Sequence, residues 1–266
     1  MNSLRRHFYI HRPFLLITTL TLLAIMLCSA WFSFAQSDLR SMAAAILSTV
    51  LLLLFVLLQI WFYSQIEKTV FPQVARWMIT KGRISSQDQI LFPYACDSRL
   101  ARPLISHLST GKLWLIDLYT PQLMTAQTTS RTRSKDLLPS KDPRFKLRPG
   151  NITLLPFQND EIDVVVIANI LTEITQFGDR KRFLTEINRV LKPNGRILIF
   201  EPIKSMTRTL VNPSSFFRFW TSTELMHHLD ISGFTRVEVQ TPAALTLLGR
   251  GLIPGRHESV QLPLEF

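Results

Sequence analysis

The sequence predicts an α/β domain with a mostly parallel sheet, preceded by a hairpin of two transmembrane helices. Two stretches, Pro13 to Ser37 and Ser41 to Ile66, carry no charged residue, and each reaches the roughly 20 apolar residues that span a bilayer. From about Gln89 onward, short apolar runs alternate with helical stretches, a pattern typical of βαβ units. The run 162–168 is apolar nearly throughout, as expected for a central strand covered on both faces.

The chain of 266 residues is predicted to have three parts. They are a membrane anchor at 1–66 with helices at about 14–35 and 42–63, a juxtamembrane helix and linker at 67–88, and the α/β domain at 89–266. The link between the two apolar runs is short. The two helices must therefore be antiparallel, because backbone polar groups cannot cross lipid unpaired.

The charges that flank the anchor predict its orientation. Basic residues precede the first apolar run and follow the second, namely Arg5, Arg6, Arg12, Lys68, Arg76, Lys81 and Arg83. Basic flanks stay on the cytoplasmic side, so both termini and the α/β domain are expected in the cytoplasm. A competing interpretation is a signal peptide cleaved after Ala35. Its apolar stretch is too long for that interpretation, and the second span would still anchor the chain.

The formal net charge of +11 suits membrane lipids or another anionic ligand, although a generally basic soluble face explains it equally well. The proline-broken loop 131–148 carries seven basic residues and two acids, and is either solvated or in contact with lipid phosphates. No nucleic-acid motif accompanies the charge, and nucleic acid is not an expected partner. The two cysteines have no metal-site spacing, so no metal is expected.

Local patterns place the elements of the α/β domain. Residues 69–81 form an amphipathic helix that either lies on lipid or, as we favour, packs on its own domain. Thr221 and Glu224 have the spacing of a capping box, and Gly233 is expected to end the helix that they begin. The predicted strands are Ile90–Tyr94, Lys112–Asp117, Arg144–Arg148, Ile162–Ala168, Arg196–Glu201, Thr235–Gln240 and Glu258–Leu264.

Three phrases at characteristic separations carry a family resemblance. They are L-P-F followed by D-V-V within 154–166, L-K-P-N-G-R-I-L-I-F-E-P at 191–202, and F-W-T-S-T-E-L at 219–225 followed by S-G-F at 232–234. Together they resemble class I S-adenosylmethionine (SAM)-dependent methyltransferases with a type 11-like domain, over roughly residues 85 to 240. The resemblance implies a Rossmann-like sheet of seven mostly parallel strands. It also implies SAM as cofactor, at the carboxyl ends of the strands.

The resemblance also implies cofactor contacts. Asp117 stands where the family binds both ribose hydroxyls, which a carboxylate accepts side by side; a strand-end turn is the alternative role. Asn151 stands where the family contacts the adenine amine, or it simply makes a turn. The other cofactor-binding candidates are Asp97, Ser98, Ala168 and Asn169.

The loop after the first strand departs from the family pattern of an acid followed by Gly-x-Gly-x-Gly. Phe92 takes the place of the acid, and Tyr94, Cys96 and Ser98 take the places of the glycines. Glycines there let the backbone approach the methionine part of SAM. Asp97 is the one nearby acid, and it either replaces the carboxylate in part or caps the next helix, which we favour.

Methyl transfer depends on positioning two partners more than on fixed acid–base residues. The weak catalytic candidates are Asn169, Thr172, Glu173 and His227. Two functions stay open. One is an active methyltransferase acting on a membrane-associated, lipid or quinone-like substrate. The other is a catalytically degenerate scaffold or regulatory subunit of a membrane protein complex.

Overall fold

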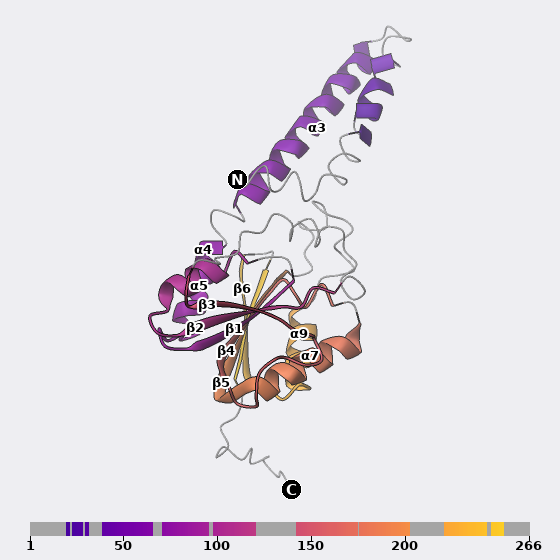
Figure 1. Cartoon of the computed structure of the whole chain (residues 1–266). Helices are drawn as coiled ribbons and strands as arrows, with labels where there is room; N and C mark the ends of the chain where they lie inside the picture. Colours follow the sequence, from indigo (N-terminus) through magenta and orange to yellow (C-terminus); the bar gives the residue numbers. More distant parts are fainter. Residues whose placement is uncertain are drawn as a thin grey trace. The chain divides into compact units, whose positions relative to one another are not determined.

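The computed structural model describes ten stretches of the chain (Figure 1). They are residues 20–21, 23–28, 30–31, 39–65, 71–95, 98–120, 142–174, 176–202, 221–243 and 246–252. The chain divides into two compact units, Met1–Val70 and Phe71–Phe266.

The first unit is dominated by a long helix, α3 (Leu39–Gln65). Its apolar side chains are open to the surroundings, and Leu53 is 59% exposed and Trp61 58%. Residues 20–21, 23–28 and 30–31 are also helical, while the rest of the predicted first helix lies outside the described residues. Over the residues that the structure describes, no helix meets the length and apolarity required of a membrane span.

The second unit contains a seven-stranded sheet in the order β3-β2-β1-β4-β5-β7-β6. The strands β1 to β5 pair in parallel, and β7 pairs antiparallel with both β5 and β6. The predicted sheet is thereby confirmed. The strands are β1 (Gln89–Tyr94), β2 (Lys112–Asp117), β3 (Phe145–Pro149), β4 (Ile162–Ala168), β5 (Leu191–Pro202), β6 (Thr235–Ala243) and β7 (Thr246–Leu252).

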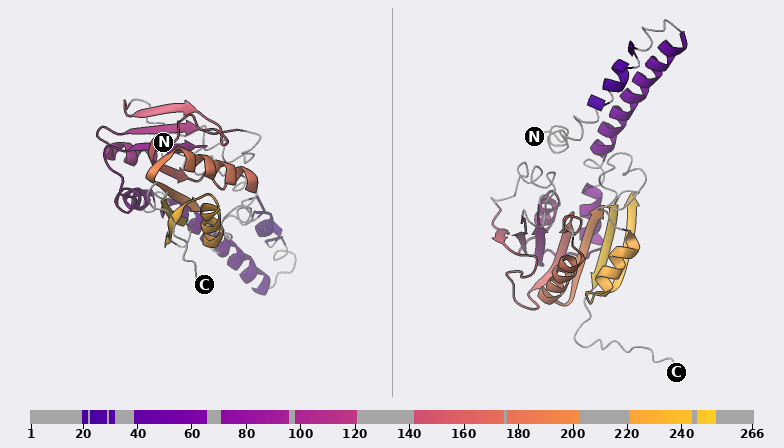
Figure 2. Two further views of the ribbon diagram at one scale, coloured as in Figure 1. Left: turned by 90° about the horizontal axis from the view of Figure 1, so that it is seen from below. Right: turned by 90° about the vertical axis from the view of Figure 1, so that its right-hand side faces the viewer.

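Helices cover both faces of this sheet. Alternate side chains of a strand point to opposite faces, and Leu91 and Val165 share one core cluster with α7 (Phe177–Val190) and α9 (Ser222–Asp230). Figure 2 shows these two helices on the same side of the sheet. The short helix α5 (Ala101–His107) packs on β2 and on α4 (Phe71–Thr80).

The helix α4 corresponds to the amphipathic segment predicted at 69–81. Its residues Val74, Ala75 and Met78 are buried. The Phe71 ring meets the Phe200 ring of β5 edge-on, with centroids 5.6 Å apart. The apolar face of α4 therefore packs on the sheet of its own unit, in agreement with the interpretation that we favoured.

The strands differ most from the prediction at β5 and β7. The strand β5 begins at Leu191 instead of the predicted Arg196, and it carries an irregularity, because Ile162 pairs with Leu191 and Val164 next pairs with Arg196. The strand β7 was not predicted, since its two glycines weaken a strand pattern. The predicted strand Glu258–Leu264 lies outside the described residues.

The capping box at the start of α9 is confirmed. Thr221 Oγ1 accepts the Glu224 backbone N–H at 3.2 Å, and Glu224 Oε2 accepts the Thr221 N–H at 2.7 Å. We expect Thr221→Ala to lower the free energy of unfolding by about 1 kcal/mol in urea titrations. Thr185→Ala, an exposed substitution inside α7, should be neutral or slightly stabilising. Equal effects of the two substitutions would contradict the capping role.

Candidate functional site

The candidate site lies along the edge of the sheet where the parallel strands end. Because β1, β2, β4 and β5 are parallel, their last residues Tyr94, Asp117, Ala168 and Pro202 meet at that edge. The strand order changes direction between β1 and β4. In open α/β sheets, ligands bind at such a switch point.

Asp117 ends β2 beside Tyr94, its register partner in β1. Its Oδ1 accepts the Tyr119 backbone N–H at 3.1 Å, which is the turn-stabilising role named above as the alternative. Its own carbonyl accepts the Gly150 N–H at 3.0 Å, so the ends of β2 and β3 are fixed together. The half-buried carboxylate is thus held at the edge in a defined orientation.

The segment after β3 is a tight turn. A Cβ on Gly150 would lie 2.3 Å from Ile116 Cγ2, so close packing requires glycine here. Asn151 is exposed, and its Oδ1 accepts the Thr153 backbone N–H at 3.0 Å and the Thr153 hydroxyl at 3.2 Å. The side chain therefore makes the turn that we gave as its second role, and its oxygen is already engaged.

The second half of β1 and Ser98, which follows it, have buried side chains. Phe92 is fully buried, and Tyr94 and Ser98 are almost so. Phe92 and Tyr94 lie on the same face of the sheet as Ile90, which pairs with Val164 of β4. Ala168 shares that face of β4 and pairs with Phe200, which α4 contacts. Phe92 and Tyr94 are core residues as well as neighbours of the site. Asp97, the other candidate after β1, lies outside the described residues.

The turn after β4 brings three of the four catalytic candidates together. Asn169 follows Ala168 with a φ of 53°, a left-handed conformation that asparagine tolerates. Thr172 is buried and Glu173 is half-buried. The turn therefore presents these residues at the edge of the sheet, next to the end of β5.

The two histidines of α9 point in different directions. His227 is exposed, whereas His228 is buried and its ring lies 4.7 Å from the ring of Phe177. Burial, and secondarily the positive charge of Arg180, lowers the pKa of His228. The structure thus places His227 on the surface of α9 and joins the neighbouring histidine to the start of α7.

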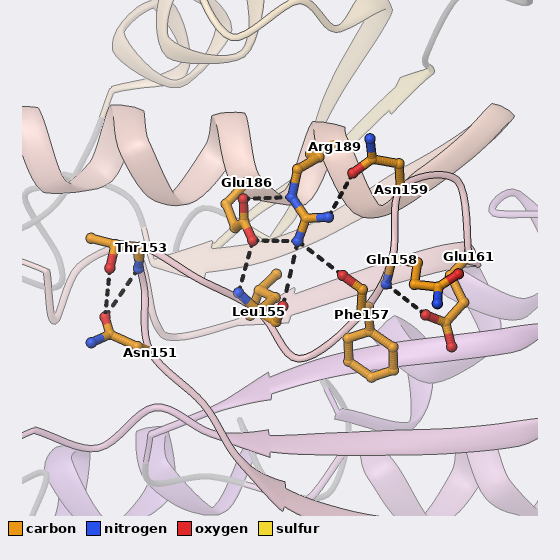
Figure 3. A network of polar contacts seen from close by, with 9 residues as sticks. All are labelled: Asn151, Thr153, Leu155, Phe157, Gln158, Asn159, Glu161, Glu186 and Arg189. Atoms are coloured by element: carbon orange, nitrogen blue, oxygen red, sulfur yellow. Dashed lines mark hydrogen bonds and ion pairs between the residues drawn. The ribbon is translucent and has the colours of Figure 1, made fainter.

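A polar network holds the loop before β4 onto α7 (Figure 3). Arg189 donates to both carboxylate oxygens of Glu186, at 2.6 and 2.9 Å, to Asn159 Oδ1 at 2.7 Å and to the Phe157 carbonyl at 3.0 Å. Glu186 Oε1 also accepts the Leu155 N–H at 2.8 Å. The Arg189 hydrogen bond, opposed by desolvation, lowers the pKa of Glu186.

Two charged residues near the site were missing from the sequence-based candidates. Glu201, at the end of β5, is buried, and its charge acts on Arg180 of α7. A glutamate after an apolar strand gives no sequence signal of burial, because it equally fits an exposed strand end. Among the described residues, no group of three metal-binding side chains occurs.

Comparison with known proteins identifies the domain. Residues 95–199 match the model of a methyltransferase domain family. Over this range the chain matches the class I SAM-dependent methyltransferase domain. The family is SAM-binding, as the sequence predicted. Its matched range begins directly after Tyr94, the last residue of β1.

A curated relative and two solved structures agree with this methyltransferase domain. The ubiquinone/menaquinone biosynthesis C-methyltransferase UbiE of Idiomarina loihiensis is 40% identical over 65 residues, which are 24% of this chain. The match spans only 25% of the length of that relative. A SAM-dependent methyltransferase from Aquifex aeolicus superposes with a TM-score of 0.56 at 16% identity, covering 71% of this chain and 93% of the other. The phosphoethanolamine N-methyltransferase 2 of Haemonchus contortus superposes with a TM-score of 0.52 at 14% identity, covering 69% of this chain and 52% of the other. At these identities the structures establish the fold alone.

Proposed function

We propose that the chain is a membrane-anchored methyltransferase that binds SAM beside Asp117 and methylates a lipid or quinone-like acceptor. The carboxylate of Asp117 carries the proposal, because it ends β2 at the switch-point edge of the sheet. The methyl group would pass by in-line displacement from the sulfonium of SAM to the acceptor. The chain's own residues would position both partners and exclude water.

Three observations support a membrane-associated acceptor. The two long uncharged apolar runs of the sequence suit a membrane anchor, and the leucines of α3 are exposed. The 65-residue match is to an enzyme named for ubiquinone and menaquinone biosynthesis. An anchor would raise the local concentration of a membrane-resident acceptor without adding contacts.

Membrane attachment is tested with the full chain. We expect the protein to stay in the pellet when membranes are washed with alkaline carbonate, and a reporter fused to Phe266 to be cytoplasmic. Release into the supernatant would contradict the anchor, and a reporter on the opposite side would contradict the orientation.

SAM binding is tested by calorimetric titration of the detergent-solubilised full chain with SAM and with its demethylated product. Asp117→Ala removes a charged acceptor of two hydroxyl hydrogen bonds, and we expect it to weaken binding by roughly 30-fold or more. The control is Asp230→Asn, an exposed change at the far end of α9, which should leave the affinity within about threefold. Equal affinities of wild type and Asp117→Ala would contradict the assigned role.

A second candidate function is a scaffold or regulatory subunit with the same fold. Phe92 and Tyr94 favour it, because buried side chains occupy the positions where the family pattern has an acid and a glycine. Each such replacement at a tight backbone contact would cost on the order of 1–3 kcal/mol of cofactor affinity. Absence of a heat signal from the wild type at millimolar ligand would support the scaffold over the enzyme.

A further inference from the structure

Glu201 forms a buried junction between two of the strands that end at the site. It is the penultimate residue of β5, and only 1% of it is exposed. Its Oε1 accepts the backbone N–H groups of Ile170 at 2.8 Å and Leu171 at 2.9 Å. The carboxylate of β5 therefore binds the turn that follows β4.

The turn 169–174 depends on these two hydrogen bonds. Asn169 N–H donates to the Phe200 carbonyl at 3.0 Å, which ends the pairing of β4 with β5. The N–H groups of Glu173 and Ile174 are satisfied within the turn by the Ile170 carbonyl. The Ile170 and Leu171 N–H groups lie between Asn169 and Glu173 in the chain, and they donate to Glu201. A buried backbone N–H without an acceptor costs about 1–3 kcal/mol.

The second carboxylate oxygen of Glu201 is not used in this way. Oε2 is buried and has no hydrogen-bond partner among the described residues. The charged and titratable groups that face this region come from α7 and α9. Burial lowers the pKa of Arg180, and the charges of Glu201 and Glu224 oppose this shift. Burial and the charge of Arg180 lower the pKa of His228, and Glu224 opposes that shift.

Burial of the carboxyl raises the pKa of Glu201 to about 7, and this effect exceeds the lowering by the backbone hydrogen bonds from Leu171 and Ile170. Near neutral pH, part of the population therefore carries a proton on this group. The protonated form still offers an acceptor to the turn, and it removes the unsolvated charge from the interior.

We propose that Glu201 is a positioning residue that fixes the turn 169–174, and with it Asn169 and Thr172, at the acceptor side of the methyl-transfer site. This inference rests on the proposed methyltransferase function. Glu201 acts through the turn, since its own carboxylate is enclosed. Its position on β5 separates it from Asp117 on β2, with β1 and β4 between them.

Hydrogen exchange of the full chain in detergent micelles tests this role without knowledge of the acceptor. In Glu201→Ala we expect the Ile170 and Leu171 amides to exchange faster by about tenfold or more, because they lose their acceptor. Glu201→Gln retains an oxygen at the same position and should keep the protection within about threefold. The Val165 and Ile197 amides, in the centres of β4 and β5, report whether the sheet is intact.

The outcomes separate positioning from a general structural role. Fast exchange confined to Ile170 and Leu171, with rescue by Gln, supports the proposal. Unchanged protection of these two amides in Glu201→Ala, or an equal loss at Val165 and Ile197, overturns it. If the alanine variant does not fold, Glu201→Asp replaces it, because the shorter side chain keeps the carboxylate but withdraws it from the turn.

A parallel SAM titration distinguishes this proposal from the proposed function. Wild type and Glu201→Gln should bind SAM with affinities within about threefold of each other. If the wild type does not bind SAM, the methyltransferase function fails, whereas the exchange data still decide whether Glu201 fixes the turn. If SAM binds and the two amides remain protected in Glu201→Ala, only the positioning role is overturned.

Discussion

Arg189→Ala is expected to lower the free energy of unfolding by about 3 kcal/mol, because it leaves the buried Glu186 carboxylate without its charged partner. Glu186 is 9% exposed and would lose the two Arg189 hydrogen bonds in Figure 3. The Phe157 carbonyl would lose its donor as well. Urea titration followed by circular dichroism measures the change, since α7 and the sheet unfold together with the network.

A neighbouring ion pair supplies the matched control. Arg182 lies on the same helix and approaches Asp179 at 3.7 Å, but its side chain is 72% exposed. Arg182→Ala should therefore change the stability by no more than about 0.5 kcal/mol. The loss of stability in Arg189→Lys should lie between those of Arg189→Ala and Arg182→Ala, because an ammonium cannot donate in the forked geometry of a guanidinium. If Arg189→Ala costs no more than Arg182→Ala, the network is not a significant source of stability.

The same network shows what sequence patterns reveal and what they leave out. The phrase around Leu155 and Phe157 pointed to a family, and the apolar run of β4 predicted its strand with the observed bounds. The partners that hold that phrase in place come from α7, some 30 residues later in the chain. Such a long-range pairing follows from tertiary packing, which local periodicity does not contain.

The positions of the candidate site residues in the fold were predicted to a similar extent. Asp117 ends β2 as expected, and Asn169 and Thr172 follow Ala168, the last residue of β4. The sequence did not show that the Asn151 oxygen is taken by Thr153, or that a buried glutamate supports the turn after β4. Both facts depend on which donors the fold brings within reach, and no spacing rule encodes them.

The pH dependence of stability should reveal the buried carboxyl of Glu201. The folded protein raises its pKa from the ordinary 4.5 to about 7, so the folded state binds more protons than the unfolded state between these values. Its contribution to stability is complete below about pH 4.5 and is lost as the pH rises through about 7. At about 1.4 kcal/mol per pKa unit, the loss is on the order of 3 kcal/mol.

Other groups change stability in the opposite direction, within this pH range or below it. The lowered pKa of Glu186 makes its contribution present above its unfolded value and lost on acidification. The same holds for Asp142, whose pKa the Arg144 hydrogen bond lowers to about 2. His228, with a lowered pKa, loses its contribution as the pH falls through about 6.5. The wild-type profile alone therefore does not isolate Glu201.

Glu201→Gln isolates it, because glutamine has the same shape and does not titrate. Free energies of unfolding from urea titrations at pH 5 and pH 8 give the difference between wild type and variant at each pH. We expect this difference to move in favour of the variant by about 2–3 kcal/mol at the higher pH. A difference independent of pH would mean that the carboxyl is solvated in the folded protein. A difference that moves in favour of the variant as the pH rises would mean that ionisation of this enclosed carboxyl lowers the stability of the wild type, a cost that is expected where the position serves the site.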